Sequence, residues 1–290
     1  MDINMKKILQ GFQVNEITES LVYARLAEIE KDRHNKEILN SIAKEEAMHY
    51  DILNKYTGCK PAPDKWKVFR YEWIARLLGI TFAIKLMEKN EGHAQQNYAA
   101  FTDYPELIQI ADDEEKHENE LIGLINEERL EYMGSVVLGL NDALVEFTGA
   151  LAGFTLALSD SKLIALTGSI TGIAAALSMA SSEYLSTKSE NGAADGKHPV
   201  KAAVYTGIAY IFTVVLLVAP FILLRNVLIA LAVMLGTAVA IIGIFNYYYA
   251  VARDESFRKR FTEMAILSFG VAGISFGIGY LLKIFTGIDA

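Results

Sequence analysis

The chain divides into an amphipathic first part and an almost continuously apolar second part. In residues 1–133, aliphatic and aromatic side chains recur every three or four positions, which is the spacing of one helix face. Beyond residue 133, long stretches hold no charged residue: 163–182, 202–224, 226–252 and 264–282. A helix that crosses a bilayer needs roughly 20 predominantly apolar residues. The pattern therefore predicts a helical domain over residues 1–133 followed by a transmembrane domain over residues 134–290.

Two breaks punctuate the first part of the chain. The segments T-G-C-K-P-A-P-D and T-D-Y-P carry the glycine and prolines that end helices. They separate helical ranges at about 14–34, 36–56, 66–101 and 106–133. Since no alternating β-branched pattern competes, we expect these four helices to pack as a bundle, and we expect an all-α fold for the whole chain.

Residues 135–159 add a fifth candidate span, although they contain two acids. Basic residues gather in the loops after the second and fourth spans: Lys188, Lys197 and Lys201, and Arg253, Arg258, Lys259 and Arg260. Such loops usually lie in the cytoplasm. We therefore expect a cytoplasmic bundle and a C-terminus outside. The segment N-E-E-R-L-E-Y-M-G-S predicts a nearly continuous helix from the bundle into the first span.

Charge separates the two parts as clearly as hydropathy does. Residues 1–133 hold 25 of the 35 acidic side chains and 17 of the 27 basic ones, so the net charge of −8 lies there. This balance favours cations as ligands and does not favour nucleic acid. The single cysteine, Cys59, excludes an internal disulfide and any Cys-x-x-Cys metal site. No secretory signal peptide is expected from the N-terminal sequence.

Acidic and histidine side chains recur at helical spacing within the bundle. The candidates are Glu16 or Glu19 on the first helix, Glu46 and His49 on the second, Glu88 and Glu91 on the third, and Glu114 and His117 on the fourth. Residues i and i+3 share a helix face, so each Glu-x-x-His pair presents an oxygen and a nitrogen to one ion. One such pair is common on a solvated face, but two pairs with further glutamates form the ligand set of dinuclear carboxylate bundles. Iron, manganese or zinc suits these donors.

The first two spans contain acids that are costly in a bilayer. Asp142 and Glu146 lie four residues apart in G-L-N-D-A-L-V-E-F-T-G-A-L-A-G-F, and Met179 and Glu183 lie four apart in the second span. Carboxylates bind divalent cations and exchange them for protons, and a thioether favours transition metals. Met179 also suits ordinary packing, and Glu183 also suits a side chain that reaches the membrane surface. The acid pair favours an ion path.

The bundle resembles rubrerythrin and the wider ferritin-like superfamily over about residues 8–130. The resemblance rests on N-E-I-T-E-S-L-V-Y-A-R-L-A and on the two Glu-x-x-His pairs. It implies Glu16 rather than Glu19 as a ligand, with Tyr23 as its companion. It also implies that the remaining ligands are Glu46, His49, Glu88, Glu91, Glu114 and His117, around a di-iron site. The cysteines of a rubredoxin-type iron site are missing.

Residues 133–285 resemble the vacuolar iron transporter family, through G-L-N-D-A-L-V-E-F and A-L-S-M-A-S-S-E-Y-L-S. The resemblance implies a homodimeric, proton-coupled exporter of ferrous iron or manganese, with an ion path at Asp142, Glu146, Met179 and Glu183. The loop after the second span lacks the glutamate-rich segment of plant-type members, so the bundle is expected to collect the metal. A ferritin-like domain fused ahead of such a transporter resembles the membrane-bound ferritins of prokaryotic cell membranes.

Two other functions fit the same residues. The bundle suits a membrane-anchored di-iron oxidase, a ferroxidase or a peroxide-scavenging enzyme, with the spans as an anchor. It also suits a sensor that gates the transporter by metal occupancy. The small-residue patterns Gly149-x-x-x-Gly153 and Gly273-x-x-x-Gly277 predict close helix packing, within one chain or between two copies.

Overall fold

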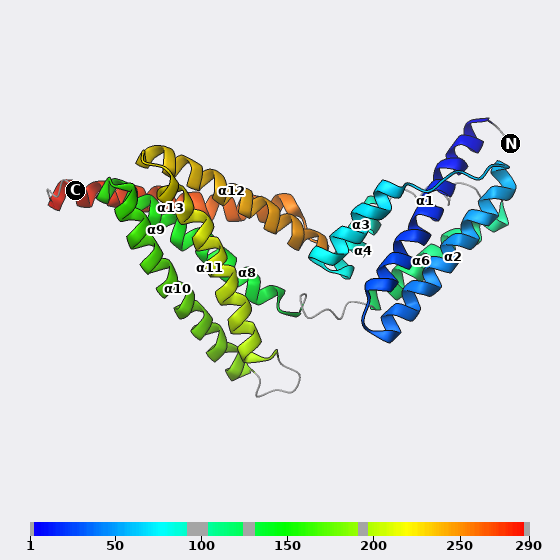
Figure 1. The fold of residues 1–290 in the computed structure, drawn as a ribbon, viewed down its shortest axis with the longest axis horizontal. Coiled ribbons are helices and arrows are strands. Elements are labelled where there is room, and N and C mark those ends of the chain that lie inside the picture. The colour runs from blue at the N-terminus through cyan, green and yellow to red at the C-terminus, as the bar shows by residue number, and fades with distance from the viewer. Residues whose placement is uncertain (1–2, 92–103, 124–130, 191–196, 287–290) are drawn as a thin grey trace. The chain divides into compact units, whose positions relative to one another are not determined.

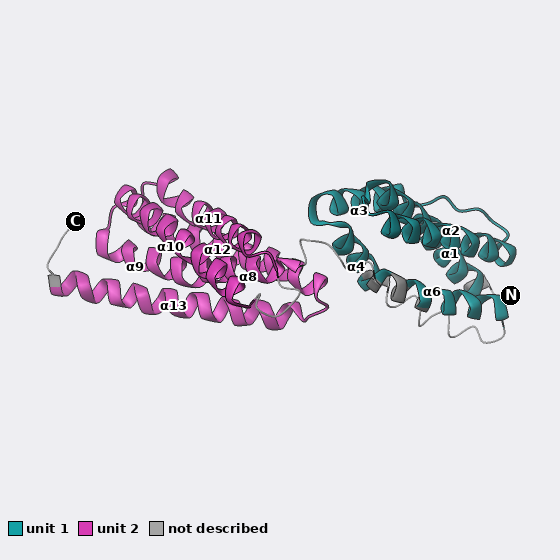
Figure 2. Ribbon diagram, turned by 90° about the horizontal axis from the view of Figure 1, so that it is seen from below, with its two compact units in different colours: residues 1–127 teal, residues 128–290 magenta. Residues whose placement is uncertain are grey.

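A computed structural model describes residues 3–91, 104–123, 131–190 and 197–286 (Figure 1). Within these ranges every regular element is a helix and no strand occurs. The expectation of an all-α protein is therefore confirmed for the described part of the chain. The chain forms two compact units, residues 1–127 and 128–290 (Figure 2). The continuous helix that we expected between bundle and first span falls largely on residues 124–130, which lie outside the described residues.

The first unit is built on a helical hairpin. Its helices are α1 (Ile3–Ile29), α2 (Arg33–Thr57), α3 (Lys65–Leu78), α4 (Ile80–Glu91) and α6 (Pro105–Gly123). Helices α1 and α2 pack along each other, α3 packs on α1, and α6 packs on α2. Their apolar faces meet in one cluster around Leu26, Ile42 and Tyr71, and in a second around Leu9 and Leu53. That the unit is a ferritin-like bundle stays a prediction.

Helix ends in the first unit follow local sequence signals. Asp32 caps α2 by accepting a hydrogen bond from the backbone N–H of Asn35, and α2 ends at Gly58, which has a φ of 66°. Asp64 caps α3 through the backbone N–H groups of the next turn. The T-G-C-K-P-A-P-D break therefore works as predicted, and it fixes where α3 begins.

The third predicted helix is not continuous, and our range of 66–101 was wrong in this respect. The structure has two helices, α3 and α4, which are separated at Gly79. Gly79 has a φ of 104° and a ψ of 153°, a backbone conformation that is open almost only to glycine. A helix cannot pass through such a residue. The predicted part beyond residue 91 lies outside the described residues.

The second unit consists of five long apolar helical segments. They comprise α8 (Met133–Asp142) with the π-helical turn η1 (Ala143–Phe147) and α9 (Thr148–Leu158), then α10 (Ser161–Glu190), α11 (Pro199–Leu223), α12 (Val227–Ala252) and α13 (Phe257–Thr286). Each is long and apolar enough to cross a membrane. The five predicted spans are thereby confirmed as membrane-competent helices, and the unit is that of a membrane protein.

Large buried side chains form the core of the second unit. Phe147, Tyr210 and Phe221 are almost fully buried between α8–α9, α10, α11 and α12. In contrast, α10 exposes Leu166, Ile170 and other aliphatic side chains at intervals of three and four residues. A continuous exposed apolar face of this kind belongs in lipid rather than in water.

Small residues allow close helix contacts within the chain. A Cβ atom on Gly279 of α13 would collide with the backbone of Gly153 on α9, and a Cβ on Gly149 would collide with Val271. The Gly149-x-x-x-Gly153 pattern therefore packs against α13 of the same chain. Among the described residues, a Cβ on Gly273 or Gly277 would meet nothing within 4 Å. In the described part of the chain, this second glycine pattern is therefore not required for a close helix contact.

Candidate metal and ion-path sites

A buried cluster of carboxylates and imidazoles lies between α1, α2 and α6. Glu16, Glu46, His49 and Glu114 each offer a ligand atom, and these atoms all lie within 4.8 Å of one another. Nδ1 of His49 is 3.3 Å from Glu16 Oε2 and 3.5 Å from Glu114 Oε1. His117 joins the cluster through its Nδ1, which is 3.2 Å from Glu46 Oε1. Helical i, i+3 spacing brings each histidine to the side of its own glutamate, and the packing of α6 on α2 brings the two pairs together.

Two further carboxylates, which sequence reasoning missed, hold the far sides of the imidazoles. Nε2 of His49 is 3.4 Å from Asp113 Oδ2, and Nε2 of His117 is 3.0 Å from Glu45 Oε2. The arrangement is reciprocal, because Asp113 lies on α6 and Glu45 on α2. Each therefore orients the histidine of the opposite helix, with Nδ1 directed into the cluster. The available signal was that each residue directly precedes a cluster glutamate, as Glu45-Glu46 and Asp113-Glu114.

The pKa values of both imidazoles and of Glu16 in the cluster lie above their usual values. Burial opposes the charge on His117, but the carboxylates of Glu46 and Glu45 outweigh this effect and raise its pKa to about 9. For His49, burial is likewise outweighed by Glu114, Glu16 and Glu46, so its pKa lies well above the usual value. Burial and then the charge of Glu46 raise the pKa of Glu16. Protons on the imidazoles thus balance the carboxylates.

Not every predicted bundle ligand lies in this cluster. Glu19 forms an ion pair with Lys67 at 3.3 Å instead, so the first helix contributes Glu16. Glu88 accepts a 2.9 Å hydrogen bond from the hydroxyl of Tyr23, which we had expected to accompany Glu16. The side chain of Glu91 lies outside the described residues. Glu88 is not among the four residues whose ligand atoms all lie within 4.8 Å of one another.

The donor set fits a divalent transition metal. Glu46 and both histidines are at most 2 % exposed. Within the described part of the chain, Glu46 Oε2, His49 Nδ1 and His117 Nδ1 make no well-directed hydrogen bond. Buried polar atoms without such bonds are costly unless something else satisfies them. A cation would satisfy all three, and mixed carboxylate and imidazole donors suit iron, manganese or zinc.

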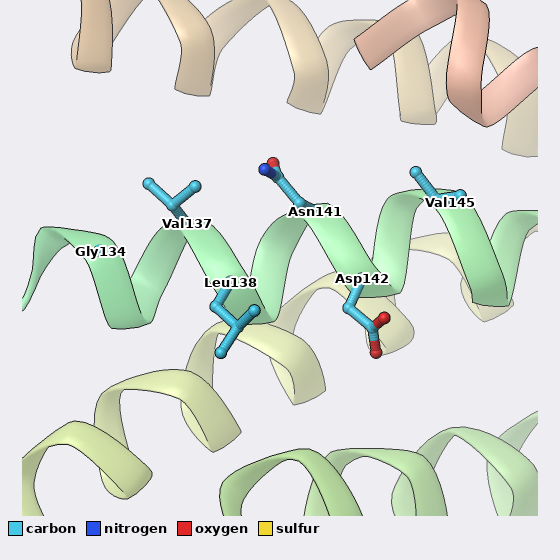
Figure 3. Close-up of a pocket in the computed structure, with 6 residues that line it drawn as sticks. All are labelled: Gly134, Val137, Leu138, Asn141, Asp142 and Val145. Atoms are coloured by element: carbon cyan, nitrogen blue, oxygen red, sulfur yellow. The ribbon is translucent and has the colours of Figure 1, made fainter. Parts of the chain in front are cut away.

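The acid pair of the first span lies at a local change of helix geometry. Asp142 ends α8, and Glu146 lies in the π-helical turn η1. Such turns place an extra residue in a helix and are frequent at functional sites. Asp142 lines a groove of about 390 Å³ with Asn141, Leu138 and other residues of α8. Figure 3 shows that Asn141 and Asp142 point to different sides of the helix.

A tyrosine that the sequence did not indicate lies near the acid pair. Tyr210 of α11 is fully buried, and its hydroxyl has no hydrogen-bond partner among the described residues. Helix α11 packs against both α8 and η1, which carry Asp142 and Glu146. Glu146 itself is exposed. The region around the acid pair therefore combines an accessible carboxylate, a groove and a buried hydroxyl.

The predicted partners on the second span lie in different surroundings. Glu183 accepts a 2.7 Å hydrogen bond from Ser135, near the start of α8. Thr206 of α11 in turn donates to the backbone oxygen of Ser135, so three helices meet here. Met179 is partly buried against the apolar core of the unit. Neither residue has a described contact with Asp142, and Glu183 is tied to the beginning of the first span.

The second unit thus has the features of a helical membrane protein with carboxylates in its first span. Residues 133–197, which contain all four predicted path residues, match the model of the VIT family. This match suggests a membrane transporter of divalent metal ions. It does not extend to the Glu/His cluster of the first unit. The chain has no match among curated proteins and none among solved structures.

Proposed function

We propose that the protein exports ferrous iron or manganese from the cytoplasm in exchange for protons. The observation that carries this proposal is the acid pair Asp142 and Glu146, beside a groove and within the segment that matches the VIT family. A carboxylate pair binds a divalent cation when ionised and releases it when protonated. In this proposal the two acids alternate between ion and protons during transport.

The neighbouring groups have supporting roles. The buried hydroxyl of Tyr210, on a helix that packs against α8 and η1, adds a polar group near the acids. Met179 adds a soft thioether that disfavours magnesium and calcium. Glu183 is hydrogen-bonded to Ser135 near the start of the first span, and in this proposal it lies at that end of the path. In this proposal the first unit faces the cytoplasm, the C-terminus lies outside in a prokaryotic cell membrane, and two copies form a homodimer.

Flux measurements test the assignment of the acid pair. The full-length protein in proteoliposomes is compared with Asp142→Asn, using a metal-sensitive dye and a pH-sensitive dye inside the vesicles. We expect the variant to lose both metal flux and the coupled proton flux. Asp160→Asn is the matched control, because Asp160 is exposed and caps α10 through the N–H of Leu163, a role that asparagine keeps. An undiminished rate in Asp142→Asn would refute the proposal.

In this proposal the Glu/His cluster of the first unit collects or senses the same metal. The residues that would hold it are Glu16, Glu46, His49, Glu114 and His117. Bound there, iron would supply redox chemistry toward oxygen or peroxide. The chain's own contribution is to bury the donors and to orient both imidazoles through Asp113 and Glu45.

The second candidate function is that of a membrane-anchored oxidase or peroxide scavenger. The one observation that favours it is the burial of the proposed metal-binding side chains in the Glu/His cluster. Glu46→Gln separates the functions, since it removes a cluster carboxylate and leaves the spans unchanged. An obligatory collector would lose metal flux in this variant. A sensor would keep flux but lose its dependence on metal concentration. An enzyme would lose oxygen or peroxide consumption, and the wild-type protein would show no metal flux.

A further inference from the structure

Helix α3 has two apolar faces, and the described residues of the first unit cover one of them. Tyr71 and Ala75 are buried in the core of that unit. Trp66, Phe69 and Trp73 are exposed by 68 %, 50 % and 50 %. Their spacing of three and four residues puts them on one side of the helix, away from the buried side chains. Exposed aromatic side chains grouped in this way indicate a binding surface.

The three aromatic side chains form a continuous surface. The rings of Trp66 and Phe69 are stacked, with centroids 5.7 Å apart, and the rings of Phe69 and Trp73 meet edge to face at 6.0 Å. Leu77, which is also exposed, extends the same side by one turn. We call Trp66, Phe69 and Trp73 the aromatic face of α3.

Basic residues flank this face in an otherwise acidic part of the chain. Helix α3 carries Lys65, Lys67, Arg70 and Arg76 against the single acid Glu72, whereas residues 1–133 carry the whole net charge of −8. Lys65 and Arg70 are exposed. A helix with tryptophan and phenylalanine on one side and lysine and arginine beside them suits the interface of an anionic bilayer.

The first unit is covalently joined to a membrane-competent segment. The first unit ends at Glu127, and the first membrane-competent segment begins at Met133. A second copy of the chain fits the face less well, because symmetric pairing would bring the basic flanks of two α3 helices together. Tryptophan is also the residue most typical of membrane interfaces, where its ring lies at the level of the headgroups.

We propose that the aromatic face of α3 docks on the surface of the anionic lipid bilayer in which the second unit is embedded. The inference rests on membrane insertion of the second unit and not on transport. In the docked state, Trp66, Phe69 and Trp73 lie among the headgroups and the upper acyl chains. Lys65 and Arg70 contact lipid phosphates.

The chain supplies its own reporter for this contact. Trp66 and Trp73 are the only two tryptophans of the protein. The full-length protein is reconstituted into vesicles of phosphatidylcholine and phosphatidylglycerol whose acyl chains carry bromine near the headgroup. Because bromine quenches indole emission on contact, we expect a clear loss of tryptophan fluorescence relative to unbrominated lipid of the same headgroups.

Two variants test whether the contact is specific. Basic residues near an anionic surface contribute about 1 kcal/mol each, so Lys65→Gln with Arg70→Gln should weaken docking roughly 25-fold and reduce the quenching. In the second variant the reporter is moved by Trp66→Phe, Trp73→Phe and Lys44→Trp. Lys44 is exposed on α2, and its indole should stay unquenched.

The following outcomes would overturn the proposal. Equal emission in brominated and unbrominated vesicles would show that the face does not reach lipid. Equal quenching of the Lys44→Trp reporter would show that the bilayer contact is not specific to α3. Unquenched, blue-shifted emission together with cross-linking between copies of the Phe69→Cys variant would assign the face to a second chain.

Discussion

Removal of one buried carboxylate from the Glu/His cluster should remove most of the stabilisation of the first unit by metal. Glu46 is the most informative position, because it is 1 % exposed and lies within 3.7 Å of Nδ1 of His49 and 3.2 Å of Nδ1 of His117. Glu46→Gln keeps the size of the side chain but weakens it as a metal ligand. It also removes a buried charge, so the metal-free stability of the variant will differ from that of the wild type.

The size of the effect follows from linkage. A ligand at 100 times its Kd stabilises the folded state by about 2.7 kcal/mol, which for a unit of this size raises Tm by about 10 °C. Loss of one group from a metal site weakens metal binding by roughly 100-fold. At the same metal concentration, the remaining stabilisation is then about 0.4 kcal/mol, which corresponds to a shift in Tm of about 2 °C. The expected contrast is therefore a shift of about 10 °C in the wild type against about 2 °C in Glu46→Gln.

Tryptophan emission during heating measures this contrast in the full-length protein. Both tryptophans lie on α3, so their emission follows the first unit whatever happens to the spans. Each variant is heated with manganese, an air-stable probe, and with a chelator, and only the difference between these two midpoints is compared. Glu37→Gln is the control, since Glu37 is exposed on α2 and pairs with the exposed Arg33. A manganese shift in Glu46→Gln equal to that in the control would refute the metal site.

Three further predictions address pH and backbone geometry. Without metal, the first unit should lose stability as pH rises from about 6.5 to 9. The reason is that the pKa of His117 is raised to about 9 in the folded state, so folding stabilises its protonated form. A melting midpoint that stays constant or rises over this interval, measured with a chelator present, would contradict the charge balance. Gly79→Ala should destabilise the first unit by about 1–3 kcal/mol in a denaturant titration, because the backbone conformation of Gly79 is strained for alanine. Gly11→Ala is the control. Gly11 lies within α1 with nothing near its Cβ, so this substitution should be neutral or slightly stabilising in the same titration. Gly279→Ala should destabilise the second unit by about 1–3 kcal/mol, because the added Cβ overpacks against α9. The detergent-solubilised protein should therefore aggregate at a lower temperature. An equal decrease in Gly273→Ala would show that general helix effects, and not this contact, are responsible.

Helical periodicity and uncharged stretches were sufficient to predict the class of fold and the five membrane-competent helices. Both signals are local, since the length and hydropathy of each helix depend only on its own residues. The break at Gly79 was missed because one glycine within a periodic pattern is usually tolerated, and only its φ of 104° ends the helix. The π-helical turn at Glu146 was missed for a related reason, because an extra residue within an apolar span leaves the composition unchanged.

Residues that act through tertiary contacts were harder to find than residues in motifs. The Glu-x-x-His pairs are visible in the sequence because both members lie on one helix. Asp113 and Glu45 became meaningful only when α2 and α6 were placed side by side, since each serves a histidine of the other helix. Tyr210 was hidden in a long aliphatic segment, and its relation to Asp142 depends on the packing of α11.

The two acidic sites differ in the property that decides how fast an ion leaves them. The donors of Glu46, His49 and His117 are almost completely buried, so we expect an ion bound there to be released slowly. The pair in the first span is less enclosed, because Glu146 is exposed on the surface of the second unit and Asp142 lines a groove. Turnover requires fast release, whereas retention or sensing requires slow release. We therefore propose that the transported ion passes the acid pair beside the groove, and that the buried cluster responds to how much metal is present.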